Sequence, residues 1–205
     1  MRARRRLLLL IGVPVVAAAC AAALLAAYLA RGVGARGQPL ALEAFAARRL
    51  RHLAIPRGAR AARNPVPLSP AVLAEARDHF ADHCASYHGN DGSGATAMGQ
   101  SLYPKAPDMR AAATQELSDG EILAIIENGV RFTGMPAWAT GTAEGTRESW
   151  ALVHFIRHLP RLTRQELVAM RQLNPVTPAE LKEREDEERF LGGEGQGAPS
   201  TPHPR

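Results

Sequence analysis

The chain has 205 residues and a formal net charge of +5, but the charge is divided unevenly along it. Residues 1–68 contain 12 arginines and one glutamate, whereas residues 69–160 contain 6 basic and 11 acidic residues. The stretch with room for an ordinary domain is therefore acidic, and the absence of a basic patch interleaved with aromatic residues argues against nucleic-acid binding. The two cysteines, Cys20 and Cys84, lie in such different contexts that we expect no structural disulfide.

The first element along the chain is an apolar run behind a cluster of arginines. Met1–Arg6 contains four arginines, and Leu7–Ala30 then supplies 24 residues without a charge. A helix of that length spans the ~30 Å hydrocarbon core of a bilayer. The run exceeds the ~7–15 apolar residues of a cleaved signal peptide, which is the alternative. We therefore predict an uncleaved single-pass anchor at 1–30, with the N-terminus in the cytoplasm because arginines precede the span.

Residues 31–68 are predicted to link the anchor to the main domain. They are rich in Arg, Ala, Gly and Pro, and they end in the extended breaker Asn64-Pro65-Val66-Pro67. Within the linker, Leu42–Ile55 has apolar residues at helical spacing with arginines between them. This pattern is typical of a basic amphipathic helix that lies on anionic lipid, and a solvated spacer is the alternative.

Residues 69–160 are predicted to form the main domain, and all of its regular elements are helices. Ser69-Pro70 places an N-cap and a first-turn proline before a helix that continues to His83. Ser118-Asp119-Gly120-Glu121 is a capping box in front of a second helix. The apolar spacing of Thr146–Leu159 predicts a third. No stretch has a convincing strand pattern, so the predicted fold class is all-α.

Residues 161–205 form a C-terminal extension. Capping boxes at Thr163 and Thr177 predict two short helices, over 164–173 and 178–190. The end of the chain is rich in Gly, Pro and Ser, which is typical of disorder.

The motif Cys84-Ala85-Ser86-Tyr87-His88 lies at the end of the first predicted helix. It matches the haem c attachment pattern C-x-x-C-H, in which two thiols bond to the haem vinyl groups and the histidine ligates iron, except that Tyr87 replaces the second cysteine. Three interpretations stay open. Haem is attached through one thioether, or the fold persists without haem, or Tyr87 is a change from a cysteine.

A methionine lies in a Gly- and Pro-rich loop behind the second predicted helix. Met135 is part of the run Gly129–Trp138, 47 residues beyond His88. A methionine in such a loop is free to point inward, whereas a helical one usually fills core. Met98 and Met109 are alternatives outside this context.

A second candidate site is a zinc- or copper-binding site on the first predicted helix. His79 and His83 are four residues apart, with Cys84 and His88 beyond them. Adjacent His83 and Cys84 side chains diverge on a helix, so surface histidines are the preferred interpretation.

From Ser69 to Pro160 the chain resembles a class I c-type cytochrome: a helix, the C-x-x-C-H-like motif, a loop, a helix, the methionine loop and an aromatic last helix. It is most similar to small membrane-anchored cytochromes of bacterial respiratory chains. The resemblance implies one haem c attached through Cys84, with His88 as the proximal and Met135 as the distal iron ligand. The departure from the family is Tyr87.

The resemblance also implies surroundings for the cofactor. Tyr103 and Pro104 resemble the family's segment near the proximal imidazole, where a backbone carbonyl accepts the ring N–H and fixes its tautomer. Tyr87 would lie beside the haem in place of the missing thiol.

The function that the resemblance implies is single-electron transfer and not enzymatic catalysis, because a His/Met pair fills both axial positions of the iron. The expected location is the bacterial inner membrane with the domain in the periplasm. The expected partners are membrane lipid and redox complexes, such as dehydrogenase donors and oxidase acceptors. The alternative is a haem-free module that keeps the fold as a membrane subunit or interaction protein.

Overall fold

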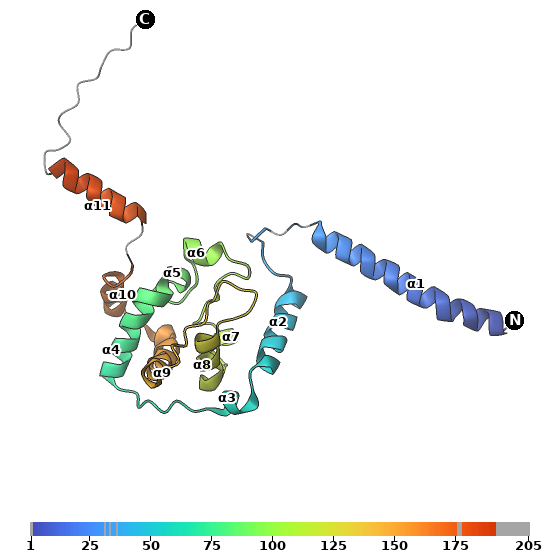
Figure 1. Cartoon of the computed structure of the whole chain (residues 1–205), viewed down its shortest axis with the longest axis horizontal. Helices are drawn as coiled ribbons and strands as arrows, with labels where there is room; N and C mark the ends of the chain where they lie inside the picture. Colours follow the sequence, from blue (N-terminus) through green and yellow to red (C-terminus); the bar gives the residue numbers. More distant parts are fainter. Residues whose placement is uncertain (1, 31, 33, 36, 176–177, 192–205) are drawn as a thin grey trace, which may run out of the picture. The chain divides into compact units, whose positions relative to one another are not determined.

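The computed structural model describes residues 2–30, 32, 34, 35, 37–175 and 178–191. It divides into two compact units, residues 1–38 and residues 39–205, and each is described by itself. Every regular element within the described residues is a helix, which confirms the predicted all-α class (Figure 1). The capping box at Thr177 and the predicted disorder from Gly192 onward fall outside the described residues.

The N-terminal unit consists mainly of helix α1, Arg2–Leu29. Ile11–Leu29 is the one described segment long and apolar enough to cross a membrane, and none of it is buried inside the protein. Length and composition are the whole of this evidence, and a signal sequence near the N-terminus has the same properties.

The first helix of the larger unit is interrupted at the haem-like motif. Helix α4, Pro70–His79, begins where the Ser69 side chain accepts a hydrogen bond from the Val72 amide at 3.2 Å. The helix then widens into a π-helical turn, η1, over Phe80–Cys84, and resumes as α5, Ala85–His88. Sequence periodicity predicts one regular helix, and π-helical turns of this kind are frequent at functional sites. The motif therefore starts at the last residue of the widened turn.

Helix α8, Asp119–Asn128, begins at the predicted capping box. The Ser118 hydroxyl accepts from the Glu121 amide, and the Glu121 carboxylate accepts from the Ser118 amide at 2.8 Å. Two amides without partners inside the helix are thus satisfied, as the sequence pattern predicts.

Helix α9, Ala143–His158, begins three residues before the predicted start. The Thr142 side chain accepts a hydrogen bond from the Gly145 amide at 3.1 Å and caps the first turn. The first turn of α9 is polar and mostly exposed, so the spacing of apolar residues does not reveal that the helix begins there.

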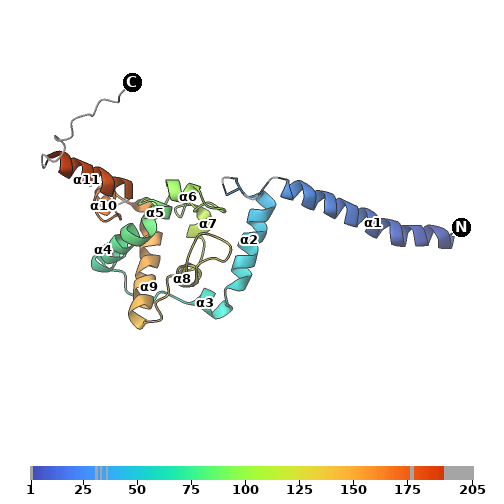
Figure 2. The same ribbon diagram turned by 45° about the horizontal axis from the view of Figure 1, so that its top comes forward.

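The core lies where α9 packs between α4 and α8 (Figure 2). The rings of Phe80 and Phe155 meet at 5.0 Å between centroids, which joins the widened turn to α9. Arg157 donates from α9 to the carbonyls of Gln115 and Leu117 and fixes the segment that leads into α8. These contacts hold the three helices that surround the pocket described below.

Part of the predicted linker packs on this core. Helix α3, Arg57–Ala61, contacts α8, and the Ser118 hydroxyl donates to the Arg60 carbonyl at 2.7 Å. A Cβ on Gly120 would lie 1.9 Å from the Ala59 carbonyl oxygen, so this approach requires glycine.

Helix α2, Ala41–Ala54, is held by polar contacts at both of its ends. The Tyr103 hydroxyl donates to Glu43 at 2.7 Å, and His52 Nδ1 lies 2.6 Å from Glu121 Oε1. Arg60 donates to His52 Nε2 at 2.6 Å, so Nδ1 carries the ring proton and donates it to Glu121. The helix predicted to lie on lipid therefore has one side facing the domain.

The remaining elements are short or peripheral. Helix α10, Arg164–Arg171, begins at the predicted Thr163 capping box and buries Met170 completely against the core. The others are α6 at Ala97–Gln100, α7 at Ala112–Gln115, the 3₁₀ turn η2 at Leu159–Arg161, and α11 at Pro178–Leu191.

Replacing Glu121 by Gln is expected to lower stability by about 1–2 kcal/mol at neutral pH, because the cap and the His52 bond both weaken. Burial by itself raises the pKa of Glu121, but the hydrogen bonds from Ser118 and His52 outweigh it and lower the pKa below its ordinary value. This contribution is complete above the unfolded pKa of ~4.3 and is lost as pH falls through the lower folded value. Denaturant unfolding at pH 7 and pH 4 measures both effects.

The exposed Glu116→Gln variant is the matched control. Equal stability of the Glu121→Gln and Glu116→Gln variants at pH 7 would show that the buried carboxylate contributes nothing.

Candidate functional site

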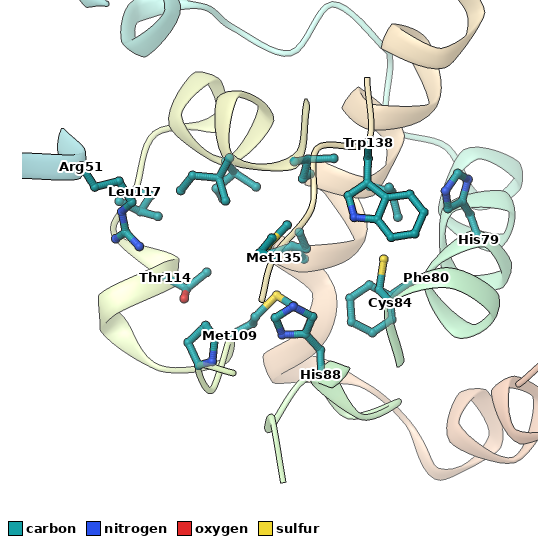
Figure 3. Close-up of a pocket in the computed structure, with 16 residues that line it drawn as sticks. Arg51, His79, Phe80, Cys84, His88, Met109, Thr114, Leu117, Met135 and Trp138 are labelled. Atoms are coloured by element: carbon teal, nitrogen blue, oxygen red, sulfur yellow. The ribbon is translucent and has the colours of Figure 1, made fainter. Parts of the chain in front are cut away.

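An apolar pocket lies among α4, η1, α8, α9 and the loop after α8 (Figure 3). Its empty volume is about 720 Å³, which includes open solvent at the mouth. Most of its wall is aliphatic and aromatic, and includes Phe80, Ile122, Ile126, Trp138, Leu152 and Ile156. The polar exceptions are few.

His88 enters the pocket from the last position of α5. The chain turns away immediately behind it, since Gly89 has φ +72° and the Gly94 amide donates to the His88 carbonyl at 2.7 Å. Burial lowers the pKa of His88 to about 4, so the imidazole is neutral at physiological pH and can ligate a metal.

The Nδ1 atom of His88 is buried without a hydrogen bond of normal geometry. The Pro107 backbone interacts with the ring and partly opposes the fall in its pKa. A metal-bound histidine donates its other ring N–H to a carbonyl or carboxylate, which fixes its tautomer, and the Pro107 carbonyl is the group beside His88 that can take this role.

Cys84 also lines the pocket, from the final residue of the widened turn. Its sulfur is a free thiol, and burial raises its pKa to about 12. The thiol is therefore protonated at neutral pH and makes a poor ligand for a free metal ion, which needs the thiolate.

Met135 reaches the same pocket from the loop after α8. The Val130 amide donates to the Met135 carbonyl at 3.1 Å, and the Met135 amide donates to the Thr133 hydroxyl at 3.1 Å. Gly129 has φ +63°, and a Cβ there would lie 2.6 Å from the Met135 carbonyl oxygen. The loop is thus folded back on the end of α8, which directs Met135 inward.

Two methionines line the pocket, and they belong to different walls. Met109 is 8% exposed, and its amide donates to the Gly92 carbonyl at 2.8 Å, so it lies on the loop that follows His88. Met98 is 49% exposed and is not part of the lining. Met135 is therefore the methionine that comes from a segment independent of His88.

The other predicted site residues are outside the pocket lining. Tyr87 and Tyr103 are half-buried and Pro104 is exposed, and none of the three contributes to the wall. The proline beside the imidazole is Pro107, three residues beyond the predicted segment. Of the six predicted cofactor contacts, the structure brings together Cys84 and His88 with the methionine of the loop.

The alternative metal site on the first helix has no support among the described residues. The only group of three acidic, His or Cys side chains there with converging ligand atoms is Glu75, Glu144 and Glu148. Arg147 forms ion pairs with Glu75 at 2.6 Å and Glu144 at 2.9 Å, so that group is an ordinary surface cluster.

His79 and His83 have roles that spacing alone does not predict. Their rings lie 4.7 Å apart, and His83 meets the edge of Trp138 at 5.7 Å. His79 is half-buried and lines the pocket, so the prediction of two surface histidines fails for this one.

Arg51 and Thr114 complete the lining, and sequence reasoning overlooked both. Arg51 belongs to α2 and lies among several arginines of the basic linker, where nothing local distinguishes it. Thr114 is in the short α7, which has no strong helical pattern.

An apolar pocket lined by a buried thiol, a neutral histidine and a loop methionine is compatible with a c-type cytochrome site, and comparison with known proteins supports that class. Residues 71–156 match the family model described as cytochrome c oxidase, cbb3-type, subunit III. The match spans the pocket helices and the methionine loop, and such a domain implies covalently bound haem c. It indicates a haem-binding electron carrier or oxidase subunit rather than an enzyme in itself. No curated protein matches the chain.

Proposed function

We propose that the chain binds one haem c in this pocket, through Cys84, His88 and Met135, and carries single electrons in a periplasmic respiratory chain. The observation that carries the proposal is the convergence of these three side chains, two from the Cys84–His88 motif and one from the separate loop after α8, on one apolar pocket. The buried His88 Nδ1 without a normal hydrogen bond fits a histidine whose other nitrogen ligates iron.

When bound, haem iron supplies a one-electron couple, and a His/Met ligand pair raises its reduction potential. His88 offers a neutral ring nitrogen because burial keeps its pKa low. The Pro107 carbonyl would accept the N–H of that ring when its other nitrogen binds iron. The aliphatic walls exclude water, which lowers the local dielectric and favours the less charged, reduced state.

Cys84 is the one cysteine in the pocket, so the proposed attachment is a single thioether. The Cys84 thiol would hold the haem by adding across one vinyl group, the sulfur bonding to one vinyl carbon and the hydrogen going to the other. Tyr87 leaves the second vinyl group unreacted.

We also propose that α1 anchors the cytochrome unit to the inner membrane, beside a donor or an oxidase acceptor. Tethering raises the effective concentration near membrane partners. The basic flank of the apolar run supports an N-terminus in the cytoplasm. A reporter fused behind Arg205 that is active only in the periplasm is expected to give signal, and a signal from a cytoplasm-only reporter would contradict this topology.

Replacing Met135 by Ala is expected to abolish the weak sulfur-to-iron absorption on the near-infrared side and to disturb the low-spin spectrum, because the sixth iron position loses its ligand. Absorption spectra of the oxidised and reduced variant measure this. Met98→Ala, at an exposed position, is the control. If Met109→Ala removes the absorption while Met135→Ala keeps it, the distal ligand is Met109.

A further inference from the structure

Helix α2 supplies one wall of the pocket, although it precedes the segment that matches the cytochrome family. Arg51 is its contribution, and it is the only arginine or lysine among the described residues that line the pocket. Figure 3 shows Arg51 beside Thr114 and Leu117, across the pocket from Cys84, with Met135 and His88 between the two sides.

The Arg51 guanidinium has no hydrogen-bonded or ion-paired carboxylate in the described part of the chain. Burial lowers the pKa of Arg51 and outweighs the opposing effect of the Glu121 charge, which raises it. Both Glu121 oxygens are already bonded, Oε1 with His52 and Oε2 with the Ser118 amide. A partly buried cation of this kind is unfavourable unless an anion pairs with it.

The chemistry of haem supplies such an anion. Its two vinyl groups and its two propionates lie on opposite sides of the ring. If Cys84 holds a vinyl group at one side of the pocket, the propionates face the other side. Arg51 and Thr114 lie on that side, and a guanidinium is the side chain best suited to a carboxylate because it donates two parallel hydrogen bonds.

We propose that Arg51 binds a haem propionate, with the Thr114 hydroxyl as a neighbouring donor, so that helix α2 forms the propionate side of the site. This proposal rests on the haem binding proposed above. The contacts Tyr103 to Glu43 and His52 to Glu121 hold α2 in place for this role. The segment between the anchor and the cytochrome then belongs to the cofactor site.

The proposal predicts the sign of an electrochemical shift. The haem carries one more positive charge when oxidised, so a cation at the propionate favours the reduced state. Removing that cation leaves an unpaired carboxylate, which favours the oxidised state. The Arg51→Gln variant is therefore expected to have a lower midpoint potential than the wild type.

The test uses full-length protein in detergent, with covalent haem per chain and midpoint potential measured for the wild type, Arg51→Gln, Arg51→Lys and Arg49→Gln. Arg49 is exposed on the same helix, with its guanidinium 5.3 Å above the Phe45 ring, and is the matched control. We expect a lower potential in Arg51→Gln, a smaller shift in Arg51→Lys, and none in Arg49→Gln. The propionate bending mode in the resonance Raman spectrum is expected to move in the two Arg51 variants alone.

If the midpoint potential and the Raman mode are unchanged in the Arg51 variants, the proposal is wrong, even if these variants are less stable. An Arg51 side chain that interacts only with Glu121 would change the stability of the protein and neither of the two haem measurements. If the Arg51→Gln protein does not accumulate in the cell, the midpoint potential and the Raman mode of the Arg51→Lys protein test the proposal instead. A wild type without haem would instead refute the proposed function, so the two failures are distinguishable.

Discussion

Replacing Tyr87 by Cys is expected to raise the yield of covalent haem and to shift the α-band of the reduced pyridine adduct to the blue. With attachment through Cys84 alone, one vinyl group would stay conjugated with the ring and withdraw electron density, which would place the band to the red of the two-thioether position. A second thiol saturates that vinyl group. It also adds a second covalent tether, which makes loss of haem from the unfolded chain harder and stabilises the loaded form.

The backbone at position 87 tolerates this change. Cys84 ends the widened turn and Tyr87 lies three residues on, in α5, which is the spacing of neighbours on a helix surface, although only Cys84 lines the pocket in this structure. The backbone there is fixed, since the Thr96 hydroxyl donates to the Tyr87 carbonyl at 3.0 Å, and a Cβ on Gly99 would lie 2.2 Å from the same oxygen. A smaller side chain therefore leaves the backbone in place.

Ser86→Cys is the control for the added thiol. Position 86 is one residue before position 87 on the helix, so its side chain points in another direction. Tyr87→Cys is expected to change both band and yield, and Ser86→Cys neither. If Tyr87→Cys leaves both unchanged, the missing thiol is irrelevant and the account of attachment is wrong.

Replacing Cys84 by Ala is expected to reduce covalent haem to background. Cys84 and Cys20 are the only cysteines in the sequence, and Cys20 lies in the other compact unit, within the apolar helix α1. Haem staining after denaturing electrophoresis measures the loss, because a covalent adduct survives denaturation and a dissociable one does not. Cys20→Ala is the control and is expected to stain like the wild type. Persistent staining of the Cys84→Ala chain would mean that another residue holds the cofactor.

Local sequence chemistry was sufficient to predict the helix starts that are marked by capping boxes. The capping boxes at Ser118 and Thr163 depend on residues three apart, and both form as predicted. The inward placement of Met135 is also a local property, since Gly129 permits the fold-back of its own loop. The helical end that carries Cys84 and His88 follows from the apolar spacing of the residues before it.

Features that depend on tertiary contacts were not predictable in this way. The widened turn η1 has no pattern of its own, and it coincides with the burial of Phe80 against α9. Pro104 and Pro107 have similar sequence surroundings, and only the fold shows that Pro107 adjoins the imidazole. Arg51 lies in a stretch whose composition is that of a basic linker, and its place in the pocket depends on contacts between α2 and distant residues such as Tyr103 and Glu121.

The central claim is that this chain holds haem in the pocket of Cys84, His88 and Met135. The most direct test is a reduced-minus-oxidised optical spectrum of the purified full-length protein, with the haem content per chain determined on the same sample. The account predicts the narrow α- and β-bands of a low-spin cytochrome and about one haem per chain. A flat difference spectrum from folded protein produced with haem-attachment machinery would contradict it, and would identify a haem-free module with a cytochrome fold.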